Sequence, residues 1–187
     1  MEPFVLTTPR LRLDQPVAAD VDDVARYCAD PVFEPFMTTP WPYERRHAEH
    51  FVGEFVPAGW ASGDEWTWAV RRREGGPLLG AVGVRMRMGM IGYWLGGPHR
   101  GRGLMPEAVA AVVDAVFART EADRVLWECV VGNTASVRVA EKAGFRFTGT
   151  EPGRVPSRDG GTAEAWTGAL DRTDDRAPKP GWPVWPV

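Results

Sequence analysis

The chain has 187 residues, of which 44% are hydrophobic and 25% are charged, as in an ordinary soluble globular domain. Its 22 Lys and Arg residues against 25 Asp and Glu residues give a net charge of −3, which argues against a broad nucleic-acid-binding surface because such a surface is strongly basic. No apolar run approaches the ~20 residues that span a bilayer, so a membrane partner is not expected either.

The first segment, MEPFVLTTPRLRL, lacks the basic and then apolar layout of a secretion signal, and a cytoplasmic location is expected. Residues 10–13 alternate Arg with Leu, as a half-buried strand does. Val21, Val24 and Cys28 then fall on one helical face, which predicts a helix that ends before the next proline. Cys28 and the only other cysteine, Cys129, form no C-x-x-C pair, so both are expected to be reduced thiols.

Residues 31–44, PVFEPFMTTPWPYE, hold four prolines and four aromatic residues and are expected to form an ordered loop. The apolar spacing of residues 48–55 predicts a second helix, which Pro57 is expected to end. His47 and His50 stand three positions apart with no third ligand evident, so no metal site is expected.

The rest of the chain alternates strands with helices. Strands are expected at residues 65–73, in one or two segments of 77–95, and at 124–131, 145–150 and 163–170, and helices at 106–120 and 133–144. This order indicates a mixed sheet with helices packed on it, an α/β or α+β domain. Residues 1–172 are expected to form that domain. Residues 173–187 are a Pro- and Trp-rich C-terminal tail, either extended and mobile or docked through Trp182 and Trp185.

The segment PHRGRGLM, residues 98–105, places glycine and arginine where a helix begins. The first N–H groups of a helix have no internal partner and carry partial positive charge, so they attract anions. Gly101 and Gly103 let an anion approach these N–H groups, and Arg100 and Arg102 can add charge-assisted hydrogen bonds to a phosphate. The pattern G-x-x-x-x-G-K-[ST] is absent, and the dinucleotide pattern is incomplete. A phosphate site and a plain tight turn both fit this segment.

The same segment resembles the signature R-x-x-G-x-G/A of the GNAT superfamily of acetyl-CoA-dependent N-acetyltransferases, with Arg100 first, Gly103 in the middle and Met105 last. Three further stretches, GNTASVRVAEKAGFRFTG, LTTPRLRLDQP and GYWLG, resemble the RimJ/RimL branch, which acetylates the N-termini of ribosomal proteins. The resemblance covers about residues 6–170. It implies a mixed α/β (α+β) fold, in which a central, mostly antiparallel mixed sheet with splayed parallel strands is flanked by helices.

The resemblance also implies how acetyl-CoA binds, with CoA as the product. The pantetheine arm would lie between the strands that end near Leu95 and Val131, and the diphosphate would lie on the N–H groups of residues 100–105. The implied cofactor-binding residues are Leu95, Arg100, Gly101, Arg102, Gly103, Leu104, Met105, Asn133 and Ser136.

For catalysis the resemblance implies direct attack of a neutral amine on the thioester, without an acyl-enzyme. Many relatives protonate the leaving thiolate with a tyrosine seven positions after the asparagine, but here that position holds Ala140. We expect Ser136 to donate to the sulfur instead; a hydrogen bond within the first helical turn is the other role open to it. Glu128 is the candidate base, against an exposed edge role, and Tyr93 is a candidate proton shuttle, against simple packing.

The acceptor is expected to be a primary amine, either a protein N-terminal α-amine or a small molecule. The candidate substrate-binding residues are Phe36, Trp41 and Tyr43 of the aromatic loop, with Phe33, Trp60 and Trp66 as further candidates, although packing accounts for most tryptophans. A CoA-binding module with little or no activity is the alternative, because the tyrosine and a strand glutamate are missing. An unrelated nucleotide-binding domain is a third possibility. The protein is expected to be a monomer or a homodimer.

Overall fold

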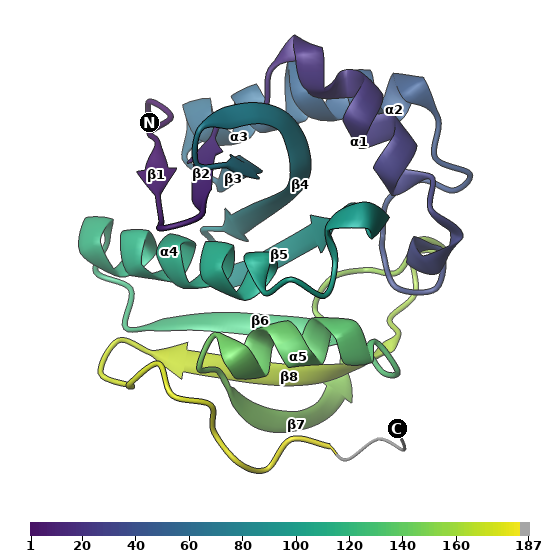
Figure 1. The fold of residues 1–187 in the computed structure, drawn as a ribbon. Coiled ribbons are helices and arrows are strands. Elements are labelled where there is room, and N and C mark those ends of the chain that lie inside the picture. Colours follow the sequence, from purple (N-terminus) through teal and green to yellow (C-terminus); the bar gives the residue numbers. More distant parts are fainter. Residues whose placement is uncertain (184–187) are drawn as a thin grey trace.

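In the computed structural model the chain forms one eight-stranded sheet, and helices pack against it (Figure 1). The strands are β1 (Leu6–Thr7), β2 (Leu11–Asp14), β3 (Glu65–Arg72), β4 (Gly75–Arg85), β5 (Met90–Leu95), β6 (Arg124–Val130), β7 (Arg146–Pro152) and β8 (Glu164–Asp171). The helices are α1 (Val21–Cys28), α2 (Arg45–His50), α3 (Val56–Ser62), α4 (Leu104–Arg119) and α5 (Thr134–Lys142). The structure describes residues 1–183, so Trp185 lies outside the described residues.

The strand order across the sheet is β1-β2-β3-β4-β5-β6-β8-β7. All neighbouring strands are antiparallel except β5 and β6, which run parallel and are joined through α4. A crossover helix between parallel strands is the usual connection, because parallel strands cannot be joined by a tight turn. This topology confirms the prediction of a mixed, mostly antiparallel sheet flanked by helices.

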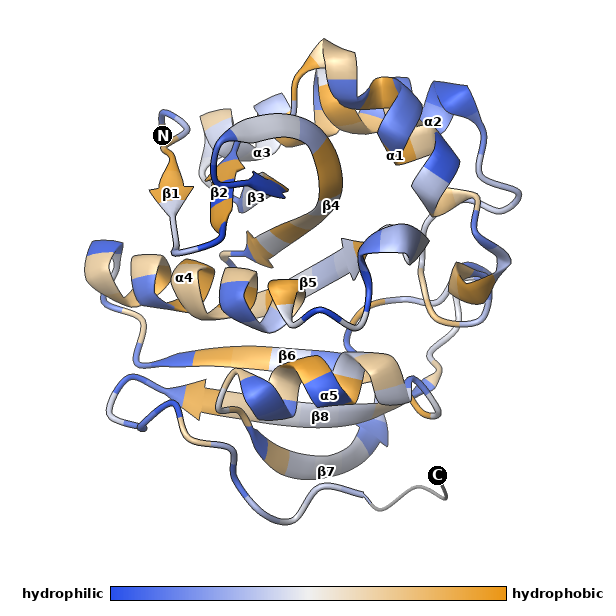
Figure 2. Ribbon diagram, in the orientation of Figure 1, coloured by the Kyte–Doolittle hydropathy of each residue, from blue (hydrophilic) through white to orange (hydrophobic). Residues whose placement is uncertain are grey.

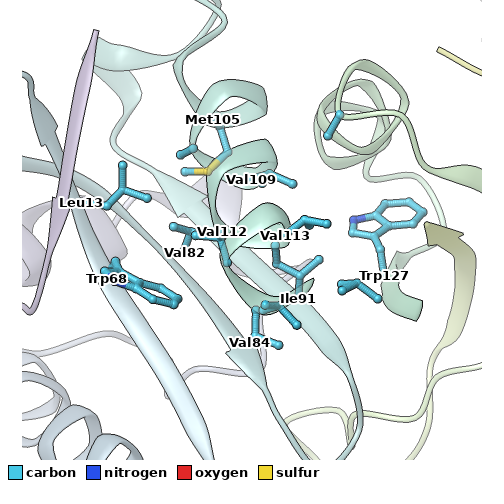
Figure 3. Close-up of a cluster of buried hydrophobic side chains, with 14 of the residues drawn as sticks. Leu13, Trp68, Val82, Val84, Ile91, Met105, Val109, Val112, Val113 and Trp127 are labelled. Atoms are coloured by element: carbon cyan, nitrogen blue, oxygen red, sulfur yellow. The ribbon is translucent and has the colours of Figure 1, made fainter. Parts of the chain in front are cut away.

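Alternation along the strands divides the core between the two faces of the sheet. On one face, α4 and α5 pack against residues such as Trp68, Val82, Ile91 and Trp127 (Figure 3). Helices α1 and α2 cover the other face around Ala69. Most of α4 is apolar (Figure 2), as a helix buried against a sheet requires. No helix of residues 1–183 is long and apolar enough to cross a membrane.

The helical segment after residue 45 runs past Pro57, so the prediction that Pro57 ends it is wrong. A π-helical turn, Phe51–Phe55, follows α2, and the N–H of Val56 donates to the carbonyl of Phe51. Pro57 then stands in the first turn of α3, where a missing N–H breaks no helical hydrogen bond. The helix ends at Gly63, which has a φ of 76°.

The segment after β8 lies on the body of the protein. Arg172 donates to the carbonyls of Phe117 and Thr120, and the Trp182 ring lies 5.6 Å from that of Trp127. A Cβ on Gly144 would stand 2.9 Å from the backbone of Arg176, so only glycine permits this close passage. Of the two predicted states of the tail, docking therefore describes residues 172–183.

A buried ion network joins the strands to the start of α1. Arg71 of β3 donates to Asp14 of β2 at 2.7 Å and to both carboxylate oxygens of Asp20 at 2.7 and 2.6 Å. The side chains of Arg71 and Asp20 are only 9% and 4% exposed. Hydrogen bonds to Asp20 raise the pKa of the Arg71 guanidinium, so it stays charged.

Removing one partner of this network should be costly. We expect Asp20→Ala to lower the free energy of unfolding by about 3 kcal/mol, because it leaves a buried charge on Arg71 with fewer partners. Urea unfolding followed by tryptophan fluorescence measures the loss. Asp64→Ala is the matched control: it removes the partner of Arg87, which is 82% exposed, and should leave the midpoint nearly unchanged. Equal shifts of the urea midpoint in the two variants would contradict a larger contribution of the buried network to stability.

Candidate active site

Between β5 and α4 the chain makes a turn whose N–H groups are free. Gly101 and Gly103 have φ values of 75° and 69°, a region that glycine enters without strain. Gly103 is the N-cap residue of α4, and its end is not capped by a side chain. No described residue accepts a hydrogen bond from the N–H of Gly101, Arg102 or Gly103, and the first N–H groups of α4 have no partner within the helix. Free N–H groups at the start of a helix attract anions.

Arg10, directly before β2, fixes the direction of these N–H groups. Its guanidinium donates to the carbonyls of Arg102 and Gly103, both at 2.9 Å, and to Glu107 at 2.5 Å. Because C=O and N–H point in opposite directions across a trans peptide, these contacts turn the N–H groups of Gly103 and Leu104 away from Arg10. Sequence reasoning missed Arg10, although it stands in the LTTPRLRL stretch.

The guanidinium of Arg100 is engaged by protein groups. Its Nε donates to the carbonyl of Leu95 at 2.9 Å, an outer nitrogen pairs with Asp30 at 2.9 Å, and the group lies 4.8 Å from the ring centroid of Phe33. The side chain thus joins the end of β5 to the loop after α1. A cofactor-binding role for Arg100 stays a prediction, as does one for Arg102, which does not line the cavity described below.

β5 and β6 pair over two positions and then part. Met90 pairs with Leu126 and Ile91 with Trp127, and no further pair joins these strands in the described part of the chain. The N–H of Leu126 donates to the carbonyl of Gly89 at 2.7 Å, which fixes the direction of the following backbone groups. The parallel strands are therefore splayed, as predicted.

A cavity of about 1610 Å³ occupies the gap between the two strands. By alternation, the backbone groups of Tyr93 and Leu95 on β5, and of Glu128 and Val130 on β6, point into this gap. The carbonyl of Leu95 accepts a hydrogen bond from Arg100, and the carbonyl of Val130 accepts the N–H of Asn133 at 3.1 Å. The remaining N–H and C=O groups of these four residues are available to a guest. The cavity reaches the free turn at one end and the aromatic loop at the other.

On the α5 side of the cavity, Tyr93, Ser136 and Trp127 form one hydrogen-bonded group. The Tyr93 hydroxyl donates to the Ser136 carbonyl at 2.8 Å, and the Ser136 hydroxyl donates to the Tyr93 oxygen at 3.2 Å. The indole N–H of Trp127 donates to Ser136 Oγ at 3.2 Å. Asn133 caps α5, since its Oδ1 accepts the N–H of Ser136 at 3.1 Å. Burial raises the pKa of the Tyr93 phenol well above its ordinary value, so the hydroxyl stays protonated at neutral pH.

Glu128 lies on the opposite face of β6 from this group, because side chains alternate along a strand. Its carboxylate accepts the N–H of Arg154 at 3.0 Å and of Val155 at 2.9 Å, which fixes the start of the β7–β8 loop. Glu128 also lines the cavity, near the open space left by the missing side chain of Gly92. The structure thus brings Tyr93, Asn133 and Ser136 together and places Glu128 apart from them.

The aromatic loop covers the Glu128 side of the cavity. Of the three predicted substrate-binding residues, Phe36 and Tyr43 line the cavity, whereas Trp41 does not. Trp60 and Trp66 are not part of the pocket: they stack 5.8 Å apart in the buried core.

Arg158, which sequence reasoning also missed, joins the β7–β8 loop to the aromatic loop. Its guanidinium donates to the carbonyls of Glu34, Met37 and Thr39 at 2.9 to 3.0 Å. It also lies 6.0 Å from the ring centroid of Trp41. No local pattern in the sequence signals such a contact, because the partners are backbone atoms of a distant segment.

The chain matches the family model described as an acetyltransferase (GNAT) domain over residues 10–146. It is also similar to the probable N-acetyltransferase YjcK of Bacillus subtilis (strain 168), with 37% identity over 78 residues. That match covers 38% of this chain and 43% of YjcK, so it spans less than half of the relative.

Solved structures with the same fold include the acetyltransferase (GNAT family) from Bacillus anthracis, with a TM-score of 0.77 and 20% identity over 90% of this chain and 98% of that one. Mycobacterium smegmatis RimJ, in complex with CoA-disulfide, has a TM-score of 0.76 and 19% identity over 92% of this chain and 90% of that one. At these identities the likeness shows the fold, which agrees with the predicted architecture.

The two buried cysteines should react slowly in the native protein. Burial raises the pKa of the Cys28 and Cys129 thiols to about 12, so about one thiol in ten thousand is ionised at pH 8. We expect Ellman's reagent to label both thiols within minutes in guanidinium chloride and far more slowly in the folded protein. Cys28→Ser isolates Cys129, the thiol nearer to Ser136, and rapid labelling of that folded variant would show a reactive thiolate in the cavity.

Proposed function

Because the chain belongs to the GNAT acetyltransferase family, we propose that it transfers the acetyl group of acetyl-CoA to a primary amine. The observation that carries the proposal is the free turn at residues 101–103, which opens into the gap between β5 and β6. A ligand with an anionic end and an extended arm of amide groups fits both features. Acetyl-CoA is such a ligand, and it supplies an activated acetyl group.

In the proposed complex the N–H groups of residues 101–105 hold the diphosphate. The backbone groups of Tyr93 and Glu128 and the N–H of Val130 pair with the pantetheine arm in place of a neighbouring strand. The side-chain amide N–H groups of Asn133 are directed to the same arm, while its oxygen caps α5. Arg10 contributes by orienting the turn rather than by touching the ligand.

Two hydroxyl groups, those of Ser136 and Tyr93, are the proposed source of the proton for the leaving thiolate. Ala140 leaves no phenol at the position where many relatives have tyrosine, but Tyr93 supplies one from β5, within 3.2 Å of Ser136 Oγ. We propose that Ser136 gives its proton to the leaving sulfur and receives a proton from Tyr93, whose hydroxyl turns from the Ser136 carbonyl to Ser136 Oγ for this step. Tyr93 then regains a proton through water. Glu128, on the acceptor side, is the proposed base, either directly or through water.

The acceptor amine is proposed to enter from the aromatic loop, past Phe36 and Tyr43. An α-amine has an ordinary pKa of about 8 against about 10.4 for a lysine side chain, so more of it is neutral at pH 7. This favours a weakly basic amine, either a protein N-terminus or a small molecule. A cytoplasmic location, a monomeric or homodimeric state, and a domain boundary at residue 172 belong to the same proposal.

Incubation with acetyl-CoA and a panel of amines and N-terminal peptides tests the proposal: thiol release should accompany a ~42 Da gain in the acceptor. Gly101→Asp should weaken CoA binding at least about tenfold, because it places a carboxylate beside the diphosphate. A Cβ at Gly101 meets nothing within 4 Å, and Gly101→Asn is a control of equal size, with the same backbone strain and no charge. CoA binding without turnover would favour the CoA-binding module, and equal affinities of the two variants would contradict the assigned turn.

Ser136→Ala and Tyr93→Phe test the proposed proton path. We expect kcat to fall at least about tenfold in each variant, with the KM for acetyl-CoA within about threefold of the original, because both changes remove a hydroxyl and keep the packing. Stopped-time measurement of thiol release gives both constants. Unchanged kcat in both variants would mean that the proton comes from another group.

A further inference from the structure

Two basic side chains of α5, Arg138 and Lys142, face the cavity without a counter-charge. Both residues are exposed and line the cavity, and neither makes a hydrogen bond or an ion pair within residues 1–183. The other arginines that line the cavity have protein partners: Arg85 pairs with Glu65, Arg158 donates to backbone carbonyls, and Arg100 pairs with Asp30. Of the Arg100 guanidinium, only Nη2 has no hydrogen-bond partner within residues 1–183. An unpaired pair of cations beside a cavity indicates an anionic ligand.

The two residues share one face of α5, because positions four apart lie one above the other on a helix, about 6 Å apart. This distance suits two cations on one phosphate group. α5 lies beside the first turns of α4 (Figure 1), and Gly103 and Leu104 line the same cavity as Arg138 and Lys142. The basic pair therefore lies on the helix that neighbours α4 and opens onto the same cavity as the free turn.

Acidic groups near this region do not oppose an anion. Glu107, the acidic residue of the first turn of α4, is held by Thr8 and Arg10 on the far side of the turn. Glu141, between the two basic residues in sequence, does not line the cavity. The positive charge of the pair is thus available to a ligand.

We propose that Arg138 and Lys142 bind the 3′-phosphate on the ribose of CoA. This inference rests on the proposed function. The free N–H groups of residues 101–105 already account for the diphosphate, and CoA carries one further phosphate, a dianion, on its adenosine. Side chains from the neighbouring helix reach beyond the turn, where that group would lie. The pair would then select CoA over ligands that lack the 3′-phosphate.

The test compares CoA with 3′-dephospho-CoA by isothermal titration calorimetry at low salt, with the full chain. We expect the unmodified protein to bind CoA about tenfold more tightly than dephospho-CoA, as for a charge-assisted contact with a phosphate. The double variant Arg138→Ala/Lys142→Ala should bind both ligands with the affinity that the unmodified protein has for dephospho-CoA. Arg87→Ala, which removes an exposed charge away from the cavity, should keep the tenfold preference.

Other outcomes of the titrations would contradict either the inference about Arg138 and Lys142 or the proposed function. Equal loss of affinity for both ligands in the double variant would place the pair on the diphosphate, and no loss would remove it from the site; either overturns the inference and leaves the proposed function standing. If the unmodified protein binds neither ligand, the proposed function itself fails. Thermal melting of each variant separates loss of binding from loss of folding.

Discussion

The parting of β5 and β6 after Ile91 and Trp127 leaves strand backbone without a neighbouring strand. Each strand is well paired on its other side, β5 with β4 and β6 with β8, so neither can shift to close the gap. Backbone N–H and C=O groups away from water need partners, and a gap of this kind suits an extended guest that supplies amides of its own. The fold thus contains a place for a missing strand, and the pantetheine arm has the chemistry to fill it.

The anionic end of such a guest depends on residues that lie far apart in the sequence. Arg10 stands directly before β2, four strands from β6 in the sheet, yet it binds the carbonyls of residues 102 and 103 because α4 crosses the face of the sheet. The direction of the N–H groups at the turn is therefore a property of the tertiary fold. Gly101 and Gly103 permit the positive φ angles of the turn, and the hydrogen bonds from Arg10 fix the orientation of its peptide groups.

The helices and strands could be predicted from the sequence because each buries one face, which leaves a periodic pattern of apolar residues. The spacing of Val21, Val24 and Cys28 and the alternation in residues 10–13 located α1 and β2, and the glycine–arginine turn was located by its residue types. Side-chain partners were not predictable, since Asp30 reaches Arg100, and Arg154 and Val155 reach Glu128, from segments with no local signal. Pro57 was misjudged because a preceding π-helical turn cannot be inferred from apolar spacing. Aromatic residues suit both cores and pockets, so Trp60 and Trp66 could not be separated from Phe36 by type.

The docked C-terminal segment has a bearing on the chemistry inside. Trp182 packs edge to face on Trp127, and the N–H of that same indole holds the hydroxyl of Ser136. Gly168 of β8 leaves room for this arrangement, since a Cβ there would press on the Trp127 ring at 3.2 Å. The Trp127 ring therefore contacts both the docked C-terminal segment and the Ser136 hydroxyl at the cavity. A change in the packing of Trp182 would therefore alter the position of the indole N–H that binds Ser136 Oγ.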